Sequence, residues 1–201
     1  MRRASCILFA AIAAAGCGGY DAPDEVTFGS VAYTQQAPGF DFKPLNTYYL
    51  DPQMEVWHDG ELQPAFQPVP PQTLDLINQK MAAYGWTAVT QTPGPGQAPA
   101  SDVGMRLAYF KTTYTYYYSG GYCSIYWAYY ACWPGYAYAG QYTTGTVLTM
   151  MIDTKAPVNQ TKVLWVSALY AVLLGSTIED TPRLNTAMAR AFDQSPYLNT
   201  K

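Results

Sequence analysis

The chain has 201 residues, of which 49% are hydrophobic and 12% are charged, and its formal net charge is −3. This length suits one domain with a substantial hydrophobic core. Nucleic acids and anionic lipids bind basic protein surfaces, and a mildly acidic chain lacks such a surface. Its charge therefore argues against both as partners.

The N-terminus has the pattern of a secretory leader. Arg2 and Arg3 precede an apolar run over 6–15, which is shorter than the roughly 20 residues needed to cross a bilayer. We therefore expect residues 1–16 to be a signal peptide. Ala14-Ala15-Gly16-Cys17 resembles the lipobox of bacterial lipoproteins, in which the Cys sulfur takes a diacylglycerol before cleavage on its amino side. Cleavage as an ordinary secretory protein after Ala13-Ala14-Ala15 is the alternative.

Lipidation at Cys17 would set the location. Gly18 follows Cys17, and the resemblance to lipoproteins of Gram-negative bacteria then implies the outer membrane, with the domain in the periplasm. Residues 17–39 contain Gly, Pro and acidic residues without sustained periodicity, so we expect a flexible tether with one early strand near 26–33. A single domain is expected over 40–201.

The first half of that domain predicts few regular elements. Alternation over 40–50 predicts a strand interrupted at Pro44, and the prolines within 51–71 predict a loop. Helical spacing over 73–84, with Pro71 before it and Gly85 after it, predicts a helix. A short strand over 86–89 and a Pro/Gly loop over 92–100 should follow.

The second half predicts longer strands. Alternation over 103–118 and over 142–153 indicates an antiparallel hairpin, and the apolar run over 163–174 is compatible with a strand or a buried helix, of which we favour a strand at its start. Thr181-Pro182 should begin a last helix that ends at Ser195-Pro196. The expected fold is therefore α+β, an antiparallel sheet of about five strands with two helices packed on one face.

A Tyr-rich segment is the anomaly of composition. Residues 109–142 contain 12 of the 19 Tyr, with Lys111 as their only charged residue. Cys6 leaves with the leader and Cys17 takes the lipid, so Cys123 and Cys132 remain, and an oxidising periplasm predicts a disulfide between them. Free thiols or half of a metal site are the alternatives. The candidate binding residues surround this pair: Tyr126, Trp127, Tyr129, Tyr130 and Trp133.

These rings either pack a long hairpin through cross-strand aromatic pairs or form a surface that binds a glycan or an envelope protein, because Tyr and Trp offer large contact area at low entropic cost. No catalytic constellation, metal site or cofactor site is predicted. His58 is the only His, and it lies in a Pro-rich stretch. Nothing there directs it toward a serine nucleophile, as a catalytic triad would require. A glycan hydrolase using Glu55, Asp59 or Glu61 is the rival hypothesis. Self-association through an exposed sheet edge is the third.

The order of elements resembles a bacterial lipoprotein family known as domain of unknown function 4136. Phe40-Asp41-Phe42 with Asn46-Thr47-Tyr48 is similar to the aromatic-Asp-Phe and Lys-Thr-Tyr opening of that family. Leu164-Trp165 falls where the family has a hydrophobic-Trp strand, and the run over 194–198 is similar to the closing phrase of some members. Two positions depart from the family pattern. Tyr49-Leu50 stands where the family usually has Ala-Trp, and Val166-Ser167-Ala168 follows Trp165 where a basic or small residue is usual. The resemblance implies a sheet packed by two helices, with no assigned activity and no catalytic residues.

Overall fold

The computed structural model describes residues 31–58, 61–111, 114–115, 122–126, 129–133, 141–142, 145–156, 162–170 and 181–201. The signal peptide expected over 1–16 and Cys17, where we expect the lipid, lie outside these residues. The helices are α1 (Pro71–Ala83), α2 (Thr181–Asp193) and the short 3-10 helix η2 (Pro196–Leu198). The strands are β1 (Val31–Gln36), β2 (Thr47–His58), β3 (Glu61–Leu62), β4 (Gln67–Pro68), β5 (Thr87–Ala88), β6 (Val103–Phe110), β7 (Tyr114–Thr115), β8 (Tyr122–Tyr126), β9 (Tyr129–Trp133), β10 (Gln141–Tyr142), β11 (Thr146–Asp153) and β12 (Val163–Tyr170).

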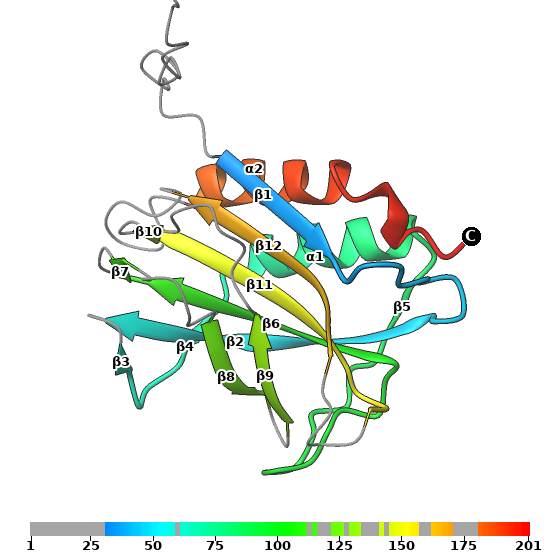
Figure 1. Ribbon diagram of the computed structural model, residues 1–201, viewed down its shortest axis with the longest axis horizontal. Coiled ribbons are helices and arrows are strands. Elements are labelled where there is room, and N and C mark those ends of the chain that lie inside the picture. Colours follow the sequence, from blue (N-terminus) through cyan, green and yellow to red (C-terminus); the bar gives the residue numbers. More distant parts are fainter. Residues whose placement is uncertain are drawn as a thin grey trace, which may run out of the picture.

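One large sheet organises the molecule (Figure 1). Its strand order is β1-β12-β11-β6-β2-β3, and β4 and β5 also pair with β2, which makes eight strands. The sheet is mixed, because β2 runs parallel to β6 and to β5 while the other pairs are antiparallel. Our expectation of about five antiparallel strands was therefore wrong in strand number and direction, although the α+β class is confirmed.

The parallel pair explains part of this difference. Parallel neighbours need a long crossover, and α1 lies between β2 and β6 in the chain. The predicted hairpin is confirmed, since β6 pairs with β11 and β7 pairs with β10 in antiparallel register. The run that begins at Val163 is a strand, β12, and it lies beside β11 as expected.

Two elements differ from the sequence prediction. The first strand is not over 40–50, because β2 begins at Thr47 and continues through Pro52 to His58, where we expected a loop. Pro52 is accommodated because the register of β2 against β6 shifts between Leu50 and Met54, and a bulge tolerates a proline. In addition, the early strand expected near 26–33 within the tether lies a few residues later, as β1, and it pairs along its whole length with β12.

The helices share one side of the sheet, which we call the helix face (Figure 1). The residues of β6 at odd positions, from Val103 to Tyr109, join one core cluster with Ile77 and Met81 of α1 and Phe192 of α2. The helices also contact each other, and both were placed correctly by their apolar spacing. Burying each large apolar side chain of this cluster contributes roughly 1.5–3 kcal/mol.

The C-terminal segment packs closely against the end of α1. Gly85, with φ of 96°, follows the helix, and its N–H donates to the carbonyl of Ala82 at 3.0 Å. A β-carbon at Gly85 would lie 2.8 Å from the side chains of Thr200 and Lys201. Only glycine meets both demands, because a positive φ disfavours other residues and the space is already filled.

The opposite side of the sheet, which we call the second face, carries a separate core. Its members are fully or almost fully buried: Ala108, Phe110, Leu148, Met150, Ile152, Val166 and Ala168. Ala98 from the Pro/Gly loop packs against them. Among the described residues outside the sheet, this loop therefore contributes to the cover of the second face.

Candidate functional site

The aromatic segment forms a hairpin of its own. Strands β8 and β9 pair antiparallel in a two-stranded sheet separate from the large one, with Tyr126 opposite Tyr129. Because successive residues of a strand alternate between its faces, the register places four aromatic residues on one face of this ladder, which we call the aromatic face: Tyr122, Tyr126, Tyr129 and Trp133. The small pair Ser124 and Ala131 lies between the two aromatic pairs on that face.

The register divides the binding residues that we predicted. Tyr126, Tyr129 and Trp133 share the aromatic face, whereas Tyr130 lies on the other face with Cys123 and Cys132. Trp127 lies outside the described residues. Tyr122 was not among our predicted binding residues, because the pairing that joins it to Trp133 is not visible in composition. Cys123 lies directly opposite Cys132.

The hairpin lies near the large sheet. Strand β9 contacts β12, and β12 has β1 and β11 hydrogen-bonded to its two edges. Its helix face is in contact with α2. The contact with β9 is therefore made on the second face or at the end of β12.

A buried ion cluster lies on the second face, and sequence reasoning missed it. Arg106 on β6 donates to Asp51 Oδ2 from Nε at 2.8 Å and from Nη2 at 2.6 Å, and its Nη1 lies 3.4 Å from Glu55 Oε1. The exposed fractions are 6% for Arg106, 6% for Asp51 and zero for Glu55. The indole N–H of Trp57 also donates to Glu55, at 3.1 Å.

The bulge in β2 makes this cluster. It interrupts the alternation of the strand at Asp51, whose Oδ1 accepts the N–H of Gln53 at 2.9 Å while Oδ2 meets the guanidinium. The ring of Phe66 lies over the same guanidinium, with its centroid 5.3 Å from Cζ. Both carboxylates therefore accept hydrogen bonds from a cation and lie buried beneath the surface.

The carboxylates of the hydrolase hypothesis do not lie in the loop where we expected them. Glu55 is buried within β2, and Glu61 is exposed on β3. Asp59 lies outside the described residues. His58 is an exposed residue at the end of β2, where it pairs with Glu61 across the ladder, rather than a loop residue. Among the described residues, no group of three or more His, Cys, Asp or Glu side chains could hold a metal ion.

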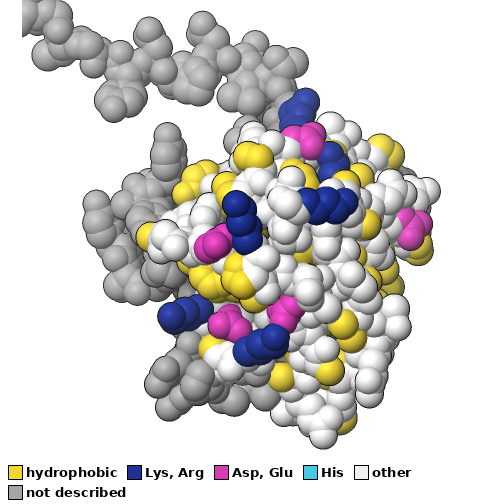
Figure 2. Space-filling model, turned by 90° about the vertical axis from the view of Figure 1, so that its right-hand side faces the viewer, with side chains coloured by type: hydrophobic (Ala, Val, Ile, Leu, Met, Phe, Trp, Pro, Cys, Tyr) yellow, Lys and Arg dark blue, Asp and Glu magenta, His cyan; other side chains and the backbone are white. Residues whose placement is uncertain are grey.

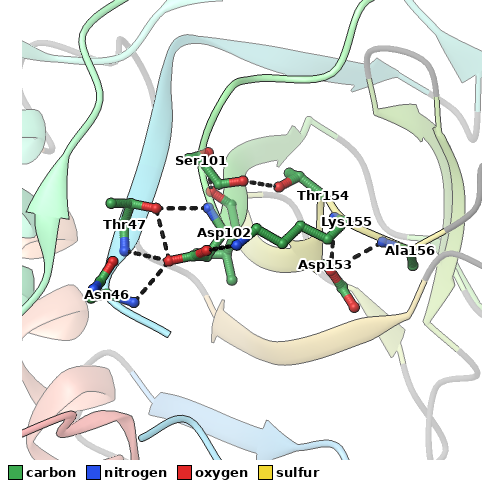
Figure 3. A network of polar contacts seen from close by, with 9 residues as sticks. Asn46, Thr47, Ser101, Asp102, Asp153, Thr154, Lys155 and Ala156 are labelled. Atoms are coloured by element: carbon green, nitrogen blue, oxygen red, sulfur yellow. Dashed lines mark hydrogen bonds and ion pairs between the residues drawn. The ribbon is translucent and has the colours of Figure 1, made fainter. Parts of the chain in front are cut away.

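A second polar network joins three strands at one end of the sheet (Figure 3). Asp102 Oδ2 accepts the N–H of Asn46 at 2.9 Å, the N–H of Thr47 at 2.9 Å and the hydroxyl of Thr47 at 2.8 Å, while Oδ1 pairs with Lys155. Burial alone raises the pKa of Asp102, but the hydrogen bonds from Lys155, Asn46 and Thr47 outweigh it and hold that pKa well below its usual range. This network fastens the starts of β2 and β6 to the turn after β11.

The residues that carry the family resemblance are structural. Phe42 and Tyr48 are buried in the core of the helix face, and the hydroxyl of Tyr48 donates to Asn78 Oδ1 at 2.7 Å. Burial raises the pKa of Tyr48 to about 12. The indole N–H of Trp165 donates to Ser195 Oγ at 2.9 Å, which ties β12 to the end of α2. These motifs therefore hold the fold together.

On the side that Figure 2 displays, Lys and Arg side chains lie next to Asp and Glu side chains. The charges of that surface are therefore mixed in sign. Lys80 on α1, for example, forms an ion pair with Asp193 on α2. No helix within the described part of the chain has the length and apolar character needed to span a bilayer.

Comparison with known proteins gives a family and a fold. The profile of a family described as domain of unknown function DUF4136 matches residues 31–197. The crystal structure of a DUF4136 family protein from Bacteroides thetaiotaomicron superposes with a TM-score of 0.61 at 21% identity, covering 86% of this chain and 99% of that one.

A PDZ domain protein from Parabacteroides distasonis gives a TM-score of 0.43 at 14% identity over 83% of this chain and 35% of its own, which is too low to support an argument. No curated protein matches the chain. The match to the family profile covers β1 through the last helices, so the chain belongs to the DUF4136 family.

Proposed function

We propose that this protein is a lipid-anchored protein of the bacterial outer membrane whose periplasmic domain binds a glycan or an envelope protein through the aromatic face of the β8–β9 hairpin. The observation that supports this most is the register of the hairpin, which gathers Tyr122, Tyr126, Tyr129 and Trp133 on one face. Aromatic residues supply large contact areas and lose little side-chain entropy on binding.

A disulfide between Cys123 and Cys132 would stiffen this surface. Directly opposed residues of an antiparallel pair have their α-carbons about 4.5–5.5 Å apart, within the range of about 4.4–6.8 Å that disulfides span, and these two Cys are opposed. In the loop-entropy model, the closed ring contributes about 2.7 kcal/mol to stability. A hairpin that is already ordered has less entropy to lose when it binds.

The proposed binding is tested with variants on the two faces of the β8–β9 hairpin. Tyr129→Ala with Trp133→Ala removes two residues of the aromatic face, and Tyr130→Ala removes one from the opposite face as the matched control. We expect the double variant to lose at least tenfold in co-sedimentation with peptidoglycan sacculi, or in cross-linking to its neighbours in intact envelopes, while the control keeps its binding. Equal binding of all three proteins, each folded by circular dichroism, would refute the proposal.

The anchor is tested separately. Mass spectrometry of the N-terminal peptide should find Cys17 carrying acyl chains, and Cys17→Ser should move the protein from the membrane fraction to the soluble periplasm. A single acyl chain gives only marginal membrane binding, so stable anchoring requires the several chains of a lipoprotein N-terminus. An unmodified Cys17 at the mature N-terminus would refute the anchor and leave the hairpin proposal standing.

We also propose that the protein has no catalytic activity. The burial of Glu55 supports this, because its carboxylate is fully shielded from solvent, where a substrate would have to reach it, and contacts Arg106 and Trp57 instead. Incubation of the full-length protein with labelled peptidoglycan should release no soluble fragments. Release of fragments that is abolished by Glu55→Gln would favour the hydrolase hypothesis instead.

A further inference from the structure

The two edges of the large sheet are built differently. The outer side of β2 is occupied by the two-residue strands β3, β4 and β5, and bonds such as Gln63 N–H to the Val56 carbonyl at 2.8 Å fill the gaps between them. Prolines 64, 68 and 70 also lie along that edge. Such short pieces and prolines prevent a further strand from adding to an edge.

The other edge is β1, and its backbone can be assigned residue by residue. The N–H of Ala37 donates to the carbonyl of Leu164 at 2.9 Å, in the register that pairs Gln36 with Trp165. Hydrogen-bonded pairs recur at every second residue of an antiparallel ladder. Val31, Tyr33 and Gln35 therefore direct their backbone groups to β12, and the three residues between and after them direct theirs outward: Ala32, Thr34 and Gln36.

These outward groups have no partner within the described part of the chain. Strand β1 pairs only with β12 there, and no backbone hydrogen bond joins Ala32, Thr34 or Gln36 to another described residue on the outer side. The sequence of β1 contains no charged residue and no proline. Charged residues and proline, two of the features that protect edge strands in other proteins, are thus lacking in β1.

From these observations we infer that β1 pairs with β1 of a second copy of this chain, in antiparallel register with Thr34 on the two-fold axis. In this register Ala32 lies opposite Gln36 of the partner subunit, and the outward groups meet in three hydrogen-bonded pairs. Tyr33 lies opposite Gln35 of the partner subunit. An isologous contact of this kind closes as a dimer, because each copy offers the same edge.

The sequence of β1 suits pairing with a second copy. Self-pairing of β1 brings no like charges together, and Thr opposite Thr is a favourable cross-strand pair. The inference concerns β1 and is independent of the aromatic hairpin.

Single-cysteine cross-linking of the full-length protein tests both the contact and its register. Thr34→Cys would place two thiols opposite each other, with α-carbons about 5.5 Å apart, which a disulfide spans. Gln36→Cys is the matched control, because each residue 36 would be about 13 Å or more from its copy. Both variants keep the other cysteines of the chain, so any cross-linking through those is common to the two.

We expect a disulfide-linked dimer from Thr34→Cys under mild oxidation and little from Gln36→Cys. Mixing Ala32→Cys with Gln36→Cys should restore the cross-link, which gives a second reading if Thr34→Cys folds poorly. Sedimentation equilibrium of the wild type should show mass doubling with concentration, and Thr34→Pro, which removes only an outward N–H, should remain a monomer. A wild type that stays monomeric, or equal cross-linking of Thr34→Cys and Gln36→Cys, would overturn the inference.

Discussion

Replacing Arg106 by Met should strongly destabilise the fold. Arg106 is the cation of a cluster that contains the buried carboxylates of Asp51 and Glu55, with exposed fractions of 6% and zero. Removing one partner of a buried ion pair leaves uncompensated charge in a poorly solvated site and costs about 3–5 kcal/mol. For a chain of this size the melting temperature should fall by roughly 6–20 °C.

The matched variant removes the whole cluster. Asp51→Leu and Glu55→Met, added to Arg106→Met, replace the three charged side chains by apolar ones, and such replacement of a complete buried cluster is often neutral or stabilising. The triple variant should therefore regain most of the stability that the single variant loses. Chemical denaturation of all three proteins gives the free energies of unfolding. A loss below about 1 kcal/mol for Arg106→Met, as expected for an exposed pair, or a triple variant no better than the single one, would refute this reasoning.

Three further predictions follow from buried or strained groups. The folded-state pKa of Asp102 lies below its usual value near 3.8, so its ionised form stabilises the fold in full above about pH 5 and this contribution is lost as pH falls below about 4. Asp102→Asn should lower the free energy of unfolding at pH 7 and differ progressively less from the wild type on acidification; a constant difference over that window would contradict the assignment. The hydroxyls of Thr149 and Ser167 are buried and have no hydrogen-bond partner among the residues that the structure describes, so Thr149→Val with Ser167→Ala should raise stability by about 1–3 kcal/mol per hydroxyl, and a decrease measured by denaturation would show that both are satisfied. Gly85→Ala should cost about 1–3 kcal/mol because of its positive φ of 96° and its contact with Thr200, whereas Gly39→Ala, at a φ of 68° with open space around it, should cost less in the same denaturation measurement.

Sequence patterns predicted elements whose periodicity is local. The alternation of β6 and β11 and the spacing of Leu184, Ala187 and Met188 in α2 each report a buried face directly. The strand β2 was missed because Pro52 interrupts it, and only the bulge against β6 shows how a proline fits there. The direction of β2 relative to β6 depends on the crossover through α1, which no periodicity encodes.

The candidate sites also differ in how much of each could be predicted from the sequence. The aromatic segment was visible in composition, but the face that each residue occupies depends on the pairing of β8 with β9. The ion cluster was not visible, because Asp51 and Arg106 are distant in the chain and meet only through the register of two parallel strands. Arg106 within an otherwise apolar strand was the one signal that could have indicated a buried partner.

The pairing of β1 with β12 also sets an order of assembly. Val31 lies opposite Tyr170, so the first strand along the chain finds its partner only after most of the sequence has been made. During synthesis from the N-terminus, the unit of β2, α1, β6 and β11 would form from nearer contacts, and β1 would join last, because distant pairings must first overcome the entropy of closing a long loop. Until then β12 would be the edge of the sheet, with its hydrogen-bonding groups turned toward solvent.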